Sequence, residues 1–157
     1  LQRARASLRV FKPKAEWPSG VDGAAAEREL VQKYVAACEQ PDLAAFMSLI
    51  REDAVQRMPP QPEIWVGRDA ILRLMVDAGF GTEEFGRVRC VTTRANRQPA
   101  VACYVLGKGD TTYRALAVDV LRIEEGMISE IVVFGPEVFG GFGLPITLDP
   151  QQGAPTV

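Results

Sequence analysis

Two ionisable side chains, Tyr34 and Asp119, lie in apolar stretches where they could do chemistry. Tyr34 falls on the apolar stripe of a predicted helix, and Asp119 stands within ALAVDVLRI, with Ala117 and Leu121 on its own face of a predicted strand. Burial against apolar side chains disfavours the charged form of a carboxyl group and raises its pKa, unless an arginine pairs with it. If both residues face a cavity, they could donate hydrogen bonds to a ligand carbonyl or oxyanion.

Both residues also have plainer interpretations, which the sequence leaves open. Tyr34 could be a core tyrosine whose hydroxyl has found a partner elsewhere in the fold. Asp119 could form an ion pair with Arg94, Arg114 or Arg122, or lie in a contact between subunits.

The segment around Met58 offers further candidates for a pocket. Residues 53–58 predict a short strand that ends at Pro59, and strand alternation places Arg57 and Met58 on opposite faces, so that one of them points outward. Met58 could line an adaptable apolar pocket, although many methionines only fill gaps in a core. Trp65 could close the mouth of such a pocket or form an aromatic packing lid.

The composition removes several classes of site. The chain has no histidine, which excludes Ser-His-Asp and Cys-His nucleophile systems and every metal site that contains histidine. The three cysteines, Cys38, Cys90 and Cys103, show neither the spacing of a zinc site nor that of a disulfide framework. We therefore expect no metal and no cofactor, and the thiols favour the reducing cytoplasm.

Apolar spacing predicts three helices before any long strand. The first covers residues 27–39, with an apolar stripe that includes Tyr34. Pro41 and Asp42 end it and cap a second helix, and a third begins near Gly67.

Four runs rich in β-branched and aromatic residues follow Gly86, and they predict an antiparallel meander. They cover residues 88–94, 100–106, 113–123 and 128–134, with turn sequences GKGD and EEGM between the later ones. With 157 residues, the chain is long enough for one ordinary domain. The order of elements predicts an α+β fold whose helices pack on one face of a curved sheet.

The two ends differ from the rest of the sequence. Residues 1–14 carry five basic side chains and no acidic one, whereas the remainder has a net charge of −7. Such an arm could contact phosphates, as Arg3 and Arg5 would, or could be a solvated linker. We expect residues 1–10 to end a helix of a longer protein, 11–26 to be a linker, 27–147 the domain and 148–157 a flexible tail. No apolar run reaches the roughly 20 residues that cross a bilayer, so no membrane partner is expected.

The sequence from residue 27 to 134 resembles the SnoaL-like branch of the nuclear-transport-factor-like superfamily. The resemblance is carried by the order and spacing of QKYVAACEQPDLAAFMSLI, EDAV, WVGRDAI and ALAVDVLRIEEGMI. It implies a cone-shaped α+β fold in which a curved sheet wraps around a pocket.

A narrower resemblance adds the arm. LQRARA looks like the end of the recognition helix in region four of extracytoplasmic-function (ECF) sigma factors, and MPPQPEIWVGRDAI, TTRANRQPAVACYV and FGGFGLP look like the SnoaL-like extension of one group of them. This resemblance implies that the parent protein binds core RNA polymerase and promoter DNA through sigma domains that precede this chain. The chain would then be a regulatory domain acting on its own sigma domains in cis, and Arg3 and Arg5 would contact DNA phosphates.

Ketosteroid isomerases of the same superfamily use a tyrosine, a general-base aspartate and a protonated aspartate. Ungapped comparison places the tyrosine at Tyr34 and the protonated aspartate at Asp119, but the base falls on Met58, whose thioether cannot abstract a proton. The expected function is therefore recognition of a small apolar ligand without turnover. The alternatives are a small isomerase or cyclase with an unidentified base, and a ligand-sensing or homodimerisation module.

Overall fold

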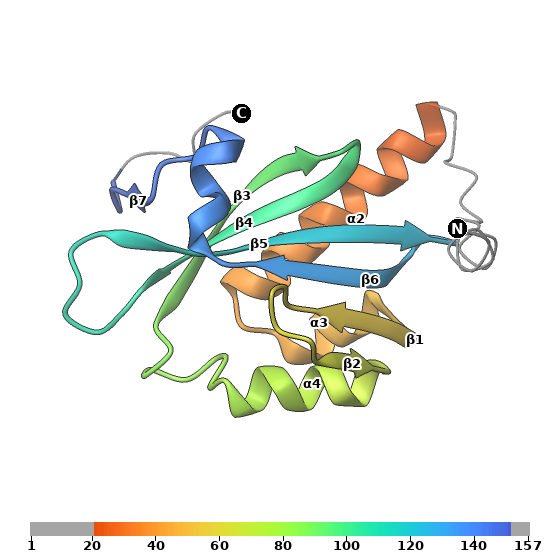
Figure 1. The fold of residues 1–157 in the computed structure, drawn as a ribbon, viewed down its shortest axis with the longest axis horizontal. Coiled ribbons are helices and arrows are strands. Elements are labelled where there is room, and N and C mark those ends of the chain that lie inside the picture. Colours follow the sequence, from red (N-terminus) through yellow and green to blue (C-terminus); the bar gives the residue numbers. More distant parts are fainter. Residues whose placement is uncertain (1–20, 152–157) are drawn as a thin grey trace, which may run out of the picture.

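A computed structural model of the chain describes residues 21–151, which form helices packed on a curved, open sheet (Figure 1). Two α-helices come first, α2 (Val21–Glu39) and α3 (Leu43–Ser48), and a third, α4 (Arg68–Asp77), follows the strands β1 and β2. The predicted recognition-helix end, the contacts of Arg3 and Arg5 and most of the predicted linker lie outside the described residues.

The helix boundaries follow local signals. The Asp42 carboxylate accepts a hydrogen bond of 2.9 Å from the backbone N–H of Ala45, so Asp42 caps α3 as predicted. The helix α2 begins at Val21 rather than at residue 27, so the last part of the predicted linker is helical instead. Three consecutive alanines at 24–26 explain this extension, because alanine has the highest helix propensity.

The sheet has the strand order β2-β1-β6-β5-β4-β3. In chain order its strands are β1 (Ile50–Arg57), β2 (Ile64–Val66), β3 (Arg87–Ala95), β4 (Gln98–Leu106), β5 (Tyr113–Glu124), β6 (Met127–Phe134) and β7 (Thr147–Leu148), which pairs with β5. The predicted meander is confirmed for β3 to β6, whose neighbours are antiparallel. The sheet as a whole is mixed, because β1 lies parallel to β6.

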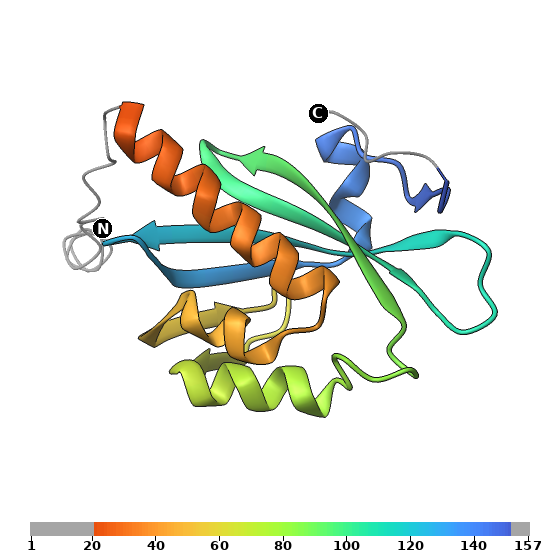
Figure 2. The same cartoon turned by 180° about the vertical axis from the view of Figure 1, so that it is seen from behind.

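Each face of the central strands is covered by a different part of the chain. The long helix α2 crosses one face, as Figure 2 shows, and packs on alternate residues that include Cys90, Cys103 and Leu121. The 3-10 helix η1 (Pro136–Phe142) lies against the opposite face, where Tyr104 and Val118 are buried. Burial on both faces accounts for the nearly continuous apolar sequence of β4.

The C-terminal covering was not predicted. Phe139 is completely buried, and its ring meets that of Tyr104 edge-on at a centroid distance of 5.1 Å. The Tyr104 hydroxyl donates a hydrogen bond of 2.9 Å to the carbonyl of Pro145, and Leu148 is buried as well. The tail predicted from residue 148 is therefore wrong for Leu148, which is held in the fold.

None of the helices within residues 21–151 has the length and hydropathy needed to cross a membrane.

We expect Phe139→Ala to lower the free energy of unfolding by about 3–5 kcal/mol, because it removes a fully buried ring and leaves a cavity between η1 and the sheet. Urea unfolding followed by circular dichroism would measure the change. Ile146→Ala is the control, since Ile146 is 67% exposed and its loss should change stability by no more than about 0.5 kcal/mol. Equal effects of the two substitutions would show that η1 does not contribute to the core.

Candidate functional site

A cavity of about 460 Å³ lies between the helices and the sheet face that α2 covers. Its apolar wall comes from α3, α4, the segment after α4 and the sheet. Its polar lining includes Tyr34, Gln56, Cys103, Asp119 and Glu137. This volume lies within the range of small-molecule sites, and the predominance of apolar lining is also typical of them.

Tyr34 and Asp119 meet at the inner end of this cavity. The helix α2 turns Tyr34 toward the sheet, where it is only 2% exposed, and β5 presents Asp119 on the same side. The Tyr34 hydroxyl donates a hydrogen bond of 2.9 Å to Oδ2 of Asp119. Both side chains line the cavity, and each is the other's hydrogen-bond partner.

Cys103 joins the same carboxylate from the neighbouring strand β4. Its thiol donates to Oδ2 of Asp119 at 3.5 Å, and its sulfur lies 3.7 Å from that of Cys90. The contact with Cys90 lowers the pKa of Cys103, but burial and the charge of Asp119 outweigh it and raise the pKa to about 12. The Cys103 thiol therefore keeps its proton at neutral pH.

The protonation states within this trio follow from burial and hydrogen bonding. Burial raises the pKa of Asp119 to about 6, while the hydrogen bonds from Tyr34 and Cys103 act in the opposite direction. Burial, reinforced by the nearby charge of Asp119, raises the pKa of Tyr34 well above its ordinary value. At pH 7 the carboxylate is mostly ionised, and both neighbours are protonated donors directed at one of its oxygens.

The alternative in which Asp119 pairs with Arg94, Arg114 or Arg122 does not match the structure. The three candidate arginines lie near other carboxylates: Arg94 pairs with Glu27 at 2.9 Å, Arg114 with Asp110 at 3.6 Å and Arg122 with Glu130 at 3.5 Å. Asp119 therefore retains its charge without a cationic partner among the described residues.

The idea that Tyr34 and Asp119 both donate to a ligand is also wrong for this arrangement. The Tyr34 hydroxyl already donates its hydrogen bond to Asp119, and the ionised carboxylate has no proton with which to donate one. The pair therefore offers a ligand the lone pairs of a carboxylate.

Of the two further pocket candidates, Met58 lines the cavity and Trp65 does not. Met58 follows β1 and lines the cavity, whereas Arg57 turns away and pairs with Glu130 at 2.9 Å, as strand alternation predicts. Trp65 lies on β2 and packs against the core, but it is not among the residues that line the cavity. Of the two roles that the sequence left open for Trp65, the structure favours packing against the core over closure of the pocket mouth.

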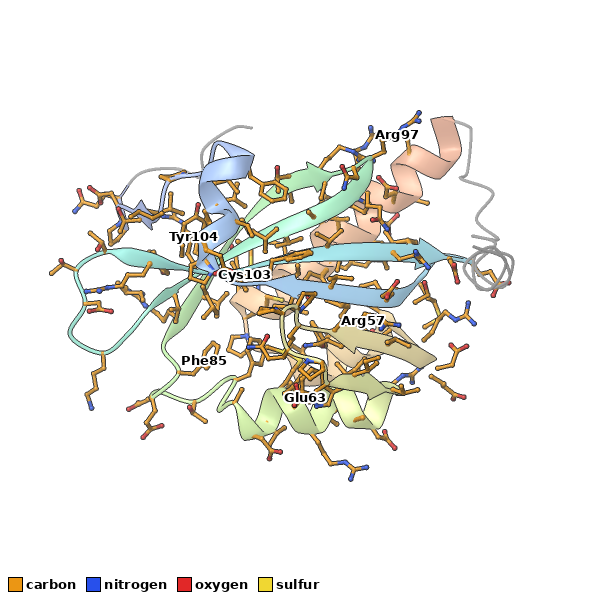
Figure 3. The ribbon with its side chains drawn as sticks, viewed as in Figure 1. Arg57, Glu63, Phe85, Arg97, Cys103 and Tyr104 are labelled. Carbon is orange, nitrogen blue, oxygen red and sulfur yellow. The ribbon has the colours of Figure 1, made fainter. Side chains whose placement is uncertain are left out.

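Several lining residues were missed from the sequence. Gln56 is buried on β1 and lines the cavity, and its position two residues before Met58 on the same strand face could have identified it. Phe80 and Phe85 meet edge-on with centroids 5.7 Å apart, and Figure 3 shows Phe85 on the segment that joins α4 to β3. No sequence periodicity marks that segment, because it is neither helix nor strand.

Within the part of the chain that the structure describes, residues 21–151, no cluster of three or more His, Cys, Asp or Glu side chains has a geometry suited to a metal ion.

The pKa of Asp119 makes stability depend on pH in a defined direction. Its pKa in the folded protein, about 6, lies above the value of about 3.9 in an unfolded chain, so the folded state binds this proton more tightly. The contribution of Asp119 to stability therefore grows as pH falls through 6 and is complete below about 4. Between pH 7 and pH 5, the difference in free energy of unfolding between wild type and Asp119→Asn should shift by about 1 kcal/mol in favour of wild type.

Urea unfolding at pH 5, 6 and 7 would measure this shift. Asp53→Asn is the matched control, because Asp53 is exposed and its hydrogen bond with Arg51 lowers its pKa, so that it stays ionised throughout this range. If the Asp119→Asn difference were as independent of pH as that of the control, the carboxyl would not have a raised pKa.

Comparison with known sequences identifies the family. Residues 31–131 match the model of the SnoaL-like domain family. The chain is also 29% identical over 149 residues to the ECF RNA polymerase sigma factor SigG of Mycobacterium tuberculosis, in strains CDC 1551 and H37Rv. That match covers 94% of this chain and 40% of the relative, so the chain spans about two fifths of the length of the curated relatives it matches.

Solved structures agree on the fold. An NTF-2-like protein of unknown function from Burkholderia xenovorans LB400 superposes with a TM-score of 0.56 at 14% identity, covering 83% of this chain and 88% of that one. The Delta 5-3-ketosteroid isomerase from a Mycobacterium species gives a TM-score of 0.52, also at 14% identity, covering 69% and 91%. At these identities the likeness shows the fold alone, and it confirms the predicted architecture. The family match over most of the described residues establishes that the chain belongs to the SnoaL-like domain family.

Proposed function

We propose that this chain is the C-terminal regulatory domain of an ECF sigma factor and that it modulates sigma-dependent transcription initiation without catalysing a reaction. The observation that carries the proposal is the similarity to the sigma factor SigG along 94% of the chain. A fold alone could not carry it, because the same fold serves enzymes and binding modules.

The partners follow from that assignment. Core RNA polymerase and promoter DNA would be bound by sigma domains that precede this chain, and the cytoplasm is where those partners meet. Arg3 and Arg5 would contact DNA phosphates in the intact protein, since guanidinium groups neutralise the phosphate backbone. The SnoaL-like domain would act on its own sigma domains in cis.

The geometry of the cavity supports binding without turnover. Met58 lines the cavity at the position of the isomerase base, and a thioether cannot take a proton. The protons of Tyr34 and Cys103 are directed at Asp119 rather than toward the open volume. These groups suit a receptor that holds its ligand in place.

Regulation requires that the domain bind the sigma domains, or a second copy of itself, differently in two states. A ligand in the cavity would shift the balance only by its difference in affinity between those states. A homodimer is one such second state, and a mass that rises with concentration in sedimentation experiments would support it.

We expect removal of the domain to change transcription from a cognate promoter by about 5-fold or more, the coupling typical of regulatory sites. Reconstituted polymerase would be tested with the intact sigma factor, with a form that ends before Val21, and with that form plus this domain added in trans. A cut before Val21 keeps α2 whole in the added domain. The sign of the change would distinguish activation from restraint.

The control is an ECF sigma factor that has no SnoaL-like extension, whose activity should not respond to the added domain. Equal transcription by the intact and shortened forms would contradict the regulatory proposal.

A second candidate is a small isomerase or cyclase, favoured by the buried Asp119, whose pKa of about 6 suits a proton-transfer group at neutral pH. In that case Asp119 would have to act as the general base while it accepts a hydrogen bond from the Tyr34 hydroxyl. Turnover of an apolar carbonyl substrate that is lost in Asp119→Asn would support this function, and turnover that survives both Asp119→Asn and Tyr34→Phe would exclude this site.

A further inference from the structure

Two polar groups in the cavity remain open to a ligand, a carboxylate oxygen that accepts and an amide that both accepts and donates. The hydrogen bonds from Tyr34 and Cys103 both end on Oδ2 of Asp119, and Oδ1 accepts none from residues 21–151. Gln56 is only 8% exposed and lines the cavity, and its side-chain amide likewise has no hydrogen-bond partner within that range. Among residues 21–151, the buried side-chain atom that lacks a partner is Nε of Arg68, so these two groups are open toward the cavity and can bind a ligand with matching groups.

The charged side chains that line the cavity are all acidic. Its ionisable carboxyl groups are those of Asp119, at the inner end, and Glu137, and no lysine or arginine is among the lining residues of the described chain. An ionised carboxylate in an apolar cavity is costly unless a charge of opposite sign or hydrogen bonds compensate it. Two hydrogen bonds compensate Asp119 in part, and a cationic ligand would complete the compensation.

The apolar wall suits a cation as well as a hydrocarbon. Aromatic rings contribute to it from four parts of the chain, namely Tyr34, Phe46, the pair Phe80 and Phe85, and Phe134. An aromatic face attracts an alkylammonium group, and this attraction grows when the group is removed from water. Met58 and Met75 add polarisable side chains that adapt to the shape of a ligand.

We propose that this cavity binds a protonated, apolar organic amine, with the ammonium group donating to Oδ1 of Asp119 and the hydrocarbon body packed among the aromatic and methionine side chains. The inference names the ligand class of the site, and it rests on the proposed function insofar as the cavity binds without turnover. Gln56 lies on β1, which β6 separates from β5, so an amine with a second polar group beyond its hydrocarbon body could reach it too.

Neutral carbonyl compounds and carboxylates fit this site less well. They need a donor beside Asp119, and the donors there already point at its Oδ2 atom, while the free amide donor of Gln56 lies two strands away. A carboxylate ligand would also place a second negative charge beside Asp119, which disfavours both charges.

The test is a series of rigid probes of one shape and different charge: 1-adamantylamine, 1-adamantanol and 1-adamantanecarboxylate. Isothermal titration of residues 1–157 at pH 7.5 should show the amine binding at least about tenfold more tightly than the alcohol, and the carboxylate not binding. This factor corresponds to one hydrogen bond to a charged group. Equal affinities for amine and alcohol, or tighter binding of the carboxylate, would overturn the proposal.

Variants assign the effect to Asp119. Asp119→Asn should reduce the affinity for the amine to that for the alcohol while leaving the alcohol unchanged, and the exposed control Asp53→Asn should behave as wild type. Near-ultraviolet circular dichroism would establish that each variant is folded. An amine preference that persists in folded Asp119→Asn would contradict the assignment.

Wild-type protein gives an independent measurement if Asp119→Asn does not fold. The other titratable side chains of the lining are Cys38 and Glu137, and the Tyr34 and Cys103 protons stay bound at these pH values. The affinity for the amine should therefore fall about threefold or more from pH 7.5 to pH 5.5, as Asp119 takes up a proton, while that for the alcohol stays constant. An amine affinity that does not change over this range would count against the site.

Transcription separates this inference from the regulatory proposal. If the amine binds as described but removal of the domain leaves transcription unchanged, only the regulatory proposal fails. If removal changes transcription but the amine shows no preference over the alcohol, only the ligand class fails.

Discussion

The site depends on the compensation of one buried charge. Asp119 stands on the central strand β5, beneath the long helix α2, where an isolated carboxylate would be strongly destabilised. The hydrogen bond from Tyr34 joins that helix to the strand, and the thiol of Cys103 supports the same oxygen from β4. The position of α2 over the sheet is therefore tied to the electrostatics of the cavity, so that any change in this carboxyl group affects both.

One face of the sheet forms a tightly packed core, and the other face borders the cavity. On one face, η1 packs closely, with Phe139 fully buried against Tyr104 and Leu148 nearby. On the other face, the helices cover the sheet but leave a volume beside Tyr34, where no buried side chain fills the space. A tightly packed layer behind the strands can hold their backbone in place while the front layer keeps an opening. This arrangement lets one small domain combine a rigid core with an open site.

The sequence predicted what local patterns determine. The helical stripe placed Tyr34 inward, alternation turned Met58 in and Arg57 out, and Asp42 marked a helix start. Features that depend on contacts between distant segments were missed or wrong. The choice of Arg94, Arg114 and Arg122 to pair with surface carboxylates is set by where the strands and turns place those acids, and the burial of Leu148 requires η1, for which the glycine-rich sequence offers no periodicity. The direction of the Tyr34 hydrogen bond was likewise beyond the sequence, because it depends on the distance between α2 and β5.

That direction decides what kind of chemistry this fold can host here. In the ketosteroid isomerase arrangement, a tyrosine and a protonated aspartate both give protons to one oxyanion. In this chain the tyrosine donates a hydrogen bond to the aspartate, and the thiol of Cys103 does the same, so both hydrogen bonds favour the ionised form of the carboxyl group. A tyrosine and an aspartate that both donate to the ligand in the isomerase therefore offer the ligand one hydrogen-bond acceptor, the carboxylate, in this chain. The ungapped comparison puts Met58 at the place of the isomerase base, and in this chain Met58 lines the cavity beside a carboxylate that accepts hydrogen bonds.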